Sequence, residues 1–318
     1  MIPFDPLFRN PHLQTIAAHF WARDGEEARF PPDWRLYRTE PSVEVLVQSQ
    51  RPTGAAAGEI VMVHGLEGSG KAGYVRGLSG AGLRAGFAVH RFHMRTCGGT
   101  EHLCRTLYHA GLTSDLLSVL RQLRQQENSP TFLVGFSLGG NVVLKLAGEL
   151  GEKARPLFHG VCAVSTPLDL GACARRMAKT ENWIYERRFV QRMRARLLAT
   201  GRYRPADFTG LRSVKDIDER ITAPSFGFGD AANYYRTQSA LRYLEGIRIP
   251  ALLIQAKDDP MVPVEIYQAE AARRSSQIEQ CVTDHGGHLG FLGRKPHRFW
   301  LDEAIIEWIL RSRAVAQT

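Results

Sequence analysis

The stretch that decides the fold reads Phe132-Leu-Val-Gly-Phe-Ser-Leu-Gly-Gly-Asn141, an apolar strand that runs through a glycine-flanked serine into a predicted helix. The strand and helix backbones crowd at such a turn, so the residues two before and two after the serine must be small, and Gly135 and Gly139 stand there. The turn raises the Ser137 hydroxyl above the sheet and leaves the N–H of Leu138 at the helix start, where the helix dipole favours a negative oxygen. The pattern predicts a serine nucleophile; an ordinary glycine-rich turn is the alternative interpretation.

A serine hydroxyl needs a base, and the base needs an orienting carboxylate. Two predicted strands further along the chain, 251–256 and 278–283, end in the polar loops 257–263 and 284–288. Parallel strands bring these loops to the sheet edge that holds the serine. The order serine, acid, histidine is the order found in α/β-hydrolases.

Each of these two loops offers two candidates. Asp258 and Asp259 are neighbours in an extended segment, so their side chains point opposite ways and only one faces the histidine. In the second loop Gly286-Gly287 leaves the chain free to aim His288 inward, and His285 is expected to be a hydrogen-bonded loop residue. As a metal pair the two histidines would need further ligands, and no others stand at convincing spacing, so we expect no metal.

A second donor for the oxyanion is expected in the loop after the early strand 59–64. There His64-Gly65-Leu66 offers the N–H of Leu66, with Gly65 allowing close approach and His64 as a structural residue. The segment Gly65–Lys71 also resembles the P-loop pattern G-x-x-x-x-G-K-[S/T], which makes a nucleotide binder an alternative function. That pattern fails at Ala72, which has no hydroxyl for Mg²⁺.

Strands alternate with helices along most of the chain, which predicts an α/β fold with a mostly parallel central sheet flanked by helices. Residues 1–40 are expected to be irregular because prolines interrupt them. The segment 167–246 breaks the alternation, so we expect a hydrolase core at 1–166 and 247–318 with a helical cap inserted between its parts. The other predicted strands are 43–48, 87–92, 131–135 and 160–165, and the predicted helices are 74–85, 113–125, 138–150, 264–274 and 299–311.

The cap segment carries most of the excess charge of a chain whose formal net charge is +9. Residues 171–204 hold ten Arg or Lys and two Asp or Glu, and the rest of the chain is close to neutral. A nucleic-acid partner would need a broader basic face, so none is expected. Within 184–198 an apolar stripe recurs at helical spacing, formed by Ile184, Phe189, Met193 and Leu197, and the arginines off that stripe are Arg187, Arg188, Arg192, Arg194 and Arg196. We expect the stripe to be buried, and the basic face would be a solvated helix surface or would attract an anionic substrate or an anionic membrane surface. Three aromatic residues of the cap segment are candidates for substrate binding: Trp183, Tyr234 and Tyr235.

Five scattered cysteines and an N-terminus without a basic or apolar leader predict a cytoplasmic protein. No stretch reaches the roughly 18 apolar residues that a membrane span needs. The oligomeric state is not set by any of these features.

With these residues placed, the chain resembles the YheT-like family of α/β-hydrolases over nearly its whole length. The motifs that carry the resemblance are Asn10-Pro-His-Leu-Gln-Thr15, His64-Gly-Leu-Glu-Gly68, Met94-Arg-Thr-Cys-Gly-Gly99, Gly135-Phe-Ser-Leu-Gly-Gly-Asn141, Tyr234-Tyr235, Asp258-Asp-Pro260 and His285-Gly-Gly-His-Leu-Gly-Phe291. The family's Arg-Gly-Cys-Ser-Gly is replaced by Arg95-Thr-Cys-Gly-Gly99, a change outside the expected site. The hydrolase pattern places the acid directly before x-x-Val-Pro, which selects Asp259.

The resemblance implies a catalytic triad of Ser137, Asp259 and His288, with carboxylesterase or lipase-like activity and no cofactor. The expected substrate is a small-molecule or lipid ester, cleaved through an acyl-enzyme with Leu66 and Leu138 as the oxyanion donors. A non-catalytic binding protein that kept the fold is a further alternative.

Overall fold

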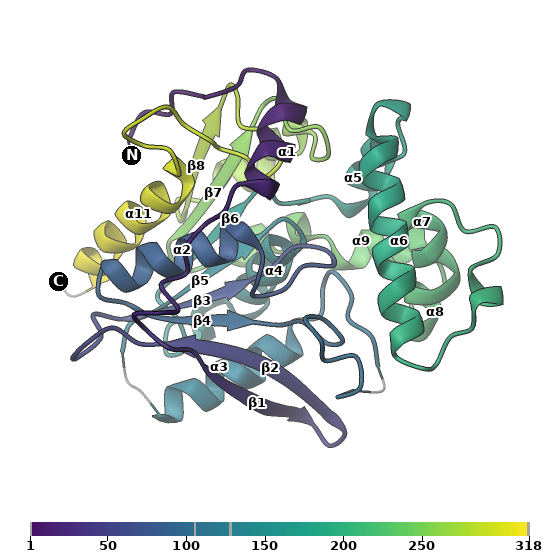
Figure 1. Ribbon diagram of the computed structural model, residues 1–318, viewed down its shortest axis with the longest axis horizontal. Coiled ribbons are helices and arrows are strands. Elements are labelled where there is room, and N and C mark those ends of the chain that lie inside the picture. The colour runs from purple at the N-terminus through teal and green to yellow at the C-terminus, as the bar shows by residue number, and fades with distance from the viewer. Residues whose placement is uncertain (1, 105, 127–128, 317–318) are drawn as a thin grey trace.

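The computed structural model describes residues 2–104, 106–126 and 129–316. Eight strands form one sheet in the order β1-β2-β4-β3-β5-β6-β7-β8 (Figure 1). Six neighbouring strands, from β4 to β8, run parallel, and β1 and β2 add an antiparallel hairpin at one edge. The predicted α/β-hydrolase fold with a mostly parallel sheet is therefore confirmed. The strands are Asp33–Glu40 (β1), Val43–Gln50 (β2), Glu59–Val63 (β3), Ala88–Phe92 (β4), Thr131–Phe136 (β5), Gly160–Val164 (β6), Ala251–Ala256 (β7) and Ile278–Thr283 (β8).

Helices cover both faces of the sheet because the central strands are apolar on both sides. Val61 and Leu133 pack with α3 and α4 on one face, and Ile60 and Phe132 pack with α2 and α11 on the other. These helices are Gly73–Arg84 (α2), Ser114–Gln126 (α3), Leu138–Leu150 (α4) and Trp300–Ala316 (α11). The 3₁₀ turn Gly151–Ala154 (η1) follows α4.

The first forty residues were expected to be irregular, and this expectation is wrong. They contain helix α1 (Pro11–Phe20) and strand β1. Pro11 does not break α1 because it stands at the first helical position, where the missing N–H has no partner to lose. The Asn10 side chain caps the helix by accepting from the N–H groups of His12 and Leu13. A proline and a cap residue at these positions start a helix.

The segment between β6 and β7 consists of helices and turns and lies to one side of the sheet, at the right of Figure 1. Its own clusters of apolar side chains hold it together, one around Met193, Leu197 and Phe208 and another around Leu170 and Tyr234. Its helices are Leu170–Met177 (α5), Trp183–Ala199 (α6), Val214–Ile217 (α7), Ala223–Ser225 (α8) and Ala231–Gln238 (α9). The segment also contains the 3₁₀ elements Thr180–Asn182 (η2), Pro205–Phe208 (η3) and Ala240–Gly246 (η5) and the π-helical turn Asp218–Thr222 (η4).

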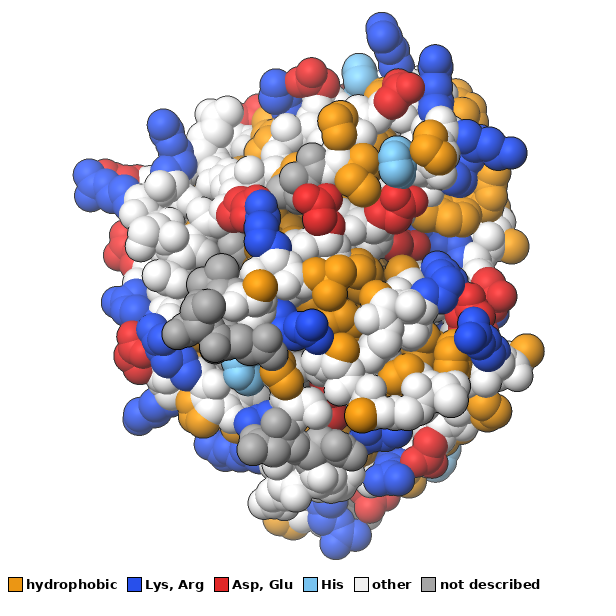
Figure 2. Space-filling model, turned by 90° about the vertical axis from the view of Figure 1, so that its left-hand side faces the viewer, with side chains coloured by type: hydrophobic (Ala, Val, Ile, Leu, Met, Phe, Trp, Pro, Cys, Tyr) orange, Lys and Arg blue, Asp and Glu red, His pale blue; other side chains and the backbone are white. Residues whose placement is uncertain are grey.

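The predicted helix 264–274 is interrupted at Ala269, which has an extended conformation. A 3₁₀ turn, Val264–Gln268 (η6), precedes the gap, and the short helix Glu270–Arg274 (α10) follows it. Among the described residues no helix has the length and apolarity needed to cross a bilayer. The face at the left of Figure 1 mixes basic, acidic and apolar side chains (Figure 2), so the net charge is not spread there as a basic field.

Candidate active site

Ser137 lies at the turn between β5 and α4, in a strained backbone conformation with φ of 51° and ψ of −120°. The flanking glycines are required by space. A Cβ on Gly135 would lie 2.4 Å from the carbonyl oxygen of Gly139, and a Cβ on Gly139 would lie 2.3 Å from that of Val63. The N–H of Ser137 donates to the carbonyl of Val164 at 2.8 Å, which ties the turn to β6. The geometry is the tight, serine-raising turn that the sequence predicts.

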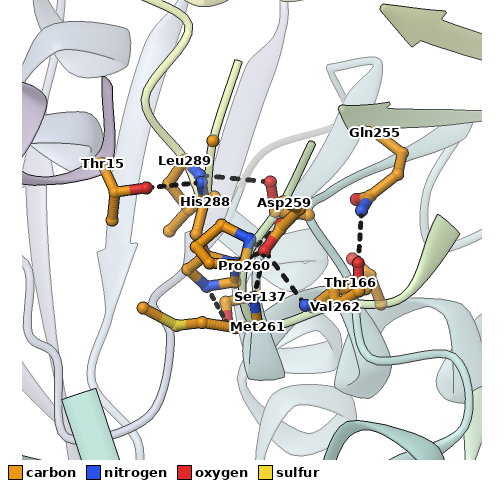
Figure 3. A network of polar contacts seen from close by, with 12 residues as sticks. Thr15, Ser137, Thr166, Gln255, Asp259, Pro260, Met261, Val262, His288 and Leu289 are labelled. Carbon is orange, nitrogen blue, oxygen red and sulfur yellow. Dashed lines mark hydrogen bonds and ion pairs between the residues drawn. The ribbon is translucent and has the colours of Figure 1, made fainter. Parts of the chain in front are cut away.

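The structure brings Ser137, His288 and Asp259 into one hydrogen-bonded chain (Figure 3). Nε2 of His288 lies 2.9 Å from Oγ of Ser137, and Nδ1 of His288 lies 2.9 Å from Oδ2 of Asp259. The carboxylate is buried and also accepts from the N–H groups of Met261 at 2.8 Å and Val262 at 3.0 Å. A carboxylate held in this way fixes the imidazole with Nδ1–H toward Asp259 and the Nε2 lone pair toward the serine hydroxyl.

The neighbouring carboxylate, Asp258, points away from this chain, as an extended segment requires. It accepts from the N–H of Gly287 at 2.9 Å and lies 3.2 Å from Nδ1 of His285. Asp258 therefore holds the loop that carries His288. The expectation of a hydrogen-bonded His285 is confirmed.

Helix α1 holds the same loop from the other side, a contact that our sequence analysis missed. Oγ1 of Thr15 accepts from the N–H of His288 at 2.8 Å and donates to the carbonyl of Pro11 (Figure 3). The Gln14 side chain donates to the carbonyl of Leu292 at 3.1 Å and accepts from its N–H at 3.0 Å. The motif Asn10–Thr15, quoted for the family resemblance, was the signal that could have located this contact.

The two expected oxyanion donors flank the serine. A Cβ on Gly65 would lie 3.1 Å from the Cβ of Ser137, so the backbone that leads to Leu66 passes directly beside the nucleophile. Leu66 and Leu138 both line the cavity at the serine. His64 is buried, and its Nε2 accepts from the N–H of Met94 at 3.2 Å. Burial lowers the pKa of His64 to about 3, which leaves the ring neutral and in a structural role.

A buried network of polar side chains holds the loop 65–68, which contains Leu66. The carboxylate of Glu67 accepts from Nε of Arg196 at 2.9 Å and from the Tyr108 hydroxyl at 3.1 Å. The carbonyl of Glu67 accepts from Arg192 at 2.6 Å, and its own φ is 54°. Burial opposes the charge of Arg196, but Glu67 raises the arginine's pKa above its ordinary value. The expectation that Arg196 lies on the solvated basic face of α6 is therefore wrong, and Ile184, expected on the buried stripe, is 54% exposed.

Two hollows meet at Ser137 and His288. The inner cavity, of about 130 Å³, is lined in part by the insertion, including Tyr234 and Tyr235. The outer groove, of about 600 Å³, lies between α1 and α6. Of the three aromatics expected at the substrate, Trp183 lines neither of these two hollows and is 56% exposed, whereas the role of Tyr234 and Tyr235 in substrate binding stays a prediction. Most of the inner lining is apolar, including Leu107, Leu170, Met177, Phe189, Met193 and Leu197.

The P-loop-like glycines are explained by packing. A Cβ on Gly68 would meet the carbonyl of Gly65 at 2.9 Å, and a Cβ on Gly70 would meet the ring of His93 at 2.7 Å. The N–H of Gly68 donates to the carbonyl of Gly65, which closes a turn rather than leaving an open phosphate cradle. Within the described residues no group of three His, Cys, Asp or Glu side chains is arranged to hold a metal ion.

The sequence matches the alpha/beta hydrolase family over residues 60–300. It is also 34% identical over 314 residues to the Escherichia coli K12 protein named "Putative esterase YheT", an alignment that covers 95% of this chain and 91% of that protein. The chain belongs to the alpha/beta hydrolase family. The expected YheT-like resemblance is confirmed, and so is the expected class, a hydrolase acting on esters.

Two further similarities agree with this assignment. The yeast protein named "Medium-chain fatty acid ethyl ester synthase/esterase 2" is 27% identical over 325 residues, which cover 90% of this chain and 69% of that one. The solved structure of the Pyrococcus furiosus esterase Pf2001 superposes with a TM-score of 0.61 at 18% identity, covering 92% of this chain and 96% of that one. At this identity the superposition shows the fold alone.

Proposed function

We propose that this alpha/beta hydrolase is a serine carboxylesterase or lipase-like enzyme that cleaves its substrate through a covalent acyl-enzyme. The observation that carries the proposal is the hydrogen-bonded chain from Ser137 through His288 to Asp259 at the point where two hollows meet. A buried carboxylate, an oriented imidazole and a serine on a strained turn are the parts that acyl transfer requires.

In the proposed mechanism Oγ of Ser137 attacks the ester carbonyl carbon as Nε2 of His288 takes the hydroxyl proton. Asp259 keeps the imidazole in the reactive tautomer and stabilises its charged form. The N–H groups of Leu66 and Leu138 donate to the tetrahedral oxyanion. His288 then gives its proton to the leaving alkoxide, and a water molecule, activated by the same histidine, hydrolyses the acyl-enzyme to free acid and serine.

The two hollows support a binding mode in which the acyl part and the alcohol part of the ester occupy different hollows. The inner cavity is mostly apolar, which suits the acyl chain of a small-molecule or lipid ester. The outer groove carries polar and basic side chains such as Lys71 and Arg192, which suit the alcohol part. In this proposal residues 167–246 act as a cap over a core formed by 1–166 and 247–318. Relatives named "Phospholipase ABHD3" in mouse and "Monoacylglycerol lipase" in yeast are consistent with a lipid ester.

The proposed compartment is the cytoplasm. All five cysteines carry free thiols, and the three most deeply placed, Cys97, Cys104 and Cys162, are buried in the fold. A reducing compartment keeps such thiols in this state.

The proposal is tested with a fluorophosphonate probe and a series of p-nitrophenyl esters of increasing acyl length. We expect the probe to label Ser137 and the Ser137→Ala variant to lose both labelling and ester turnover while it keeps its thermal unfolding midpoint. Ser118→Ala, on the outer helix α3, is the matched control and should label normally. Labelling that persists in Ser137→Ala would contradict the assignment. A folded wild type that neither labels nor turns over any ester would favour the non-catalytic binding protein, and saturable ATP binding would favour the nucleotide binder.

A further inference from the structure

Exposed apolar side chains gather beside the outer groove. Ten large apolar side chains are exposed among the described residues, and six of them lie on α1, at its C-terminal end or at the start of α6. Phe20 is 74% exposed, more than any other. The six are Leu13, Ile16, Phe20, Trp21, Trp183 and Ile184, called here the apolar rim. Single exposed apolar residues are ordinary, but such a concentration marks an interaction surface.

The rim surrounds the entrance to the proposed active site. Ile16, Phe20 and Ile184 line the outer groove together with Ser137 and His288. Two side-chain contacts join α1 to α6, the two helices that form the walls of the groove. The Tyr185 hydroxyl lies 3.0 Å from Nδ1 of His12, and Nη2 of Arg188 donates to Nε2 of His19 at 2.7 Å. Any surface that covers the rim therefore also covers the entrance to the groove.

The exposed charged side chains on α6 are all positive, and the exposed carboxylate just before the helix, Glu181, pairs with Arg176. From residue 182 to residue 200 every exposed charged side chain is an arginine, and the single acidic residue of that stretch, Glu186, is buried. The exposed arginines are Arg187, Arg188, Arg192 and Arg194. Burial and the nearby charges of Arg188 and Arg192 lower the pKa of His19. Lys71 lines the same groove.

We propose that the apolar rim and the arginines of α6 dock this enzyme onto an anionic lipid surface, with the outer groove opening toward the lipid. The proposal rests on the function proposed above, and it specifies that the ester is taken from a lipid assembly. Exposed aromatic and aliphatic side chains enter the interfacial region, and arginines beside them pair with lipid phosphates. The combination of both features on one face is what such a surface requires.

A second copy of the chain fits this face less well. A two-fold contact brings the same patch of both subunits together, so the arginines of one α6 would meet those of the other. Like charges placed together in an interface oppose association. An anionic lipid surface supplies the opposite charge over the whole patch.

The experiment compares flotation of the full chain with vesicles of phosphatidylcholine alone and with vesicles that mix phosphatidylcholine and phosphatidylglycerol. We expect binding to the anionic vesicles that weakens as salt rises, because counterions screen charges beyond roughly 8 Å at physiological salt. Arg187→Gln should weaken it about fivefold, since an arginine near an anionic membrane contributes about 1 kcal/mol. The double variant Leu13→Ser with Trp183→Ser should weaken it by roughly tenfold or more.

Each variant has a matched control. Trp34→Ser with Leu36→Ser removes two apolar residues that are equally exposed on β1, and Arg273→Gln removes an exposed arginine on α10. Both controls should bind the anionic vesicles as the wild type does. Leu13, Trp183 and Arg187 do not line the groove, so their variants should still hydrolyse a water-soluble p-nitrophenyl ester at the normal rate.

The docking proposal and the proposed function fail separately. Normal hydrolysis of the soluble ester with no vesicle binding, or with equal losses in the rim variants and the β1 control, overturns the docking proposal alone. Vesicle binding without fluorophosphonate labelling overturns the proposed function. A dimer in solution that the rim variants dissociate would assign the rim to a second copy and overturn the lipid assignment.

Discussion

Arg196 on helix α6 and Glu67 in the loop after β3 form a buried ion pair in which Nη2 and Oε1 lie 2.8 Å apart. The side chains are 8% and 3% exposed, so solvent screens the pair little. Glu67 directly follows Leu66, whose N–H is a proposed oxyanion donor. Helix α6 of the insertion therefore holds the backbone of the proposed oxyanion loop and links the insertion to the proposed active site.

Arg196→Met is predicted to lower both stability and turnover. Removing one partner of a buried pair leaves the other charge uncompensated, which costs about 3–5 kcal/mol. The double variant Arg196→Met with Glu67→Gln should regain part of that stability, because it removes the stranded carboxylate. Denaturant unfolding and kcat on a soluble ester are the measurements. Arg194→Met, on an exposed arginine of the same helix, is the control and should change little. Equal effects of the Arg194 and Arg196 changes would contradict the pair's role.

The sequence was sufficient to predict the parallel part of the sheet and the tight turn at Ser137, because each depends on a local pattern. Gly135 and Gly139 are needed wherever a strand turns this tightly into a helix. The Glu67–Arg196 pair joins residues 129 positions apart, and no local pattern encodes it. Helical periodicity placed Arg196 on the exposed face because this pattern describes one helix in isolation. In the structure α6 packs against both the loop that carries Glu67 and the rest of the segment 167–246, so Arg196 is buried. Helix α1 was missed because its proline was read as a breaker and not as a first helical residue.

Asp259→Asn is predicted to lower kcat by about 10⁴ with the fold intact, because the amide would favour the wrong imidazole tautomer. Asp258→Asn is the adjacent control. Asp258 holds the N–H of Gly287 and not the ring of His288, so its loss should lower kcat far less. Steady-state kinetics on a p-nitrophenyl ester compare the two variants. A larger loss for Asp258→Asn would reverse the assignment of the acid.

Thr15→Val is predicted to lower kcat roughly tenfold to a hundredfold with little change in KM, since a misplaced catalytic group costs about this much. Valine fills the same space as threonine but cannot accept from the N–H of His288. Thr15→Ser keeps the hydroxyl and should restore most of the loss. A Thr15→Val variant in which KM rises and kcat is unchanged would show that the residue affects binding rather than the position of His288.

The last prediction concerns Asp218, a buried carboxylate in the segment 167–246. Among the described residues no ion pair joins its side chain to a cation. The Tyr235 hydroxyl donates to its Oδ2 at 2.7 Å. Burial raises the pKa of Asp218 to about 6, and Glu186 adds to the rise, while the hydrogen bonds from Tyr235 and Thr222 oppose it. The folded state therefore keeps the proton to a higher pH than the unfolded state, whose carboxyl ionises near its ordinary value of 3.8.

It follows that the contribution of Asp218 to stability falls as the pH rises from about 4 to about 6 and stays low above that. Asp218→Asn carries no ionisable group, and its amide oxygen can still accept from Tyr235. The variant should therefore gain stability relative to the wild type as the pH rises, by up to about 3 kcal/mol at pH 8, since a pKa shift of one unit corresponds to 1.36 kcal/mol. Thermal unfolding of both proteins at about pH 5 and pH 8 should show about half of this gain between the two pH values, because the unfolded carboxyl is already mostly ionised at pH 5. Glu245→Gln, on an exposed carboxylate of the same segment, should show no such trend. A difference between Asp218→Asn and the wild type that is the same at both pH values would mean that Asp218 ionises alike in the folded and unfolded chains, and that its burial is fully compensated by Tyr235 and Thr222.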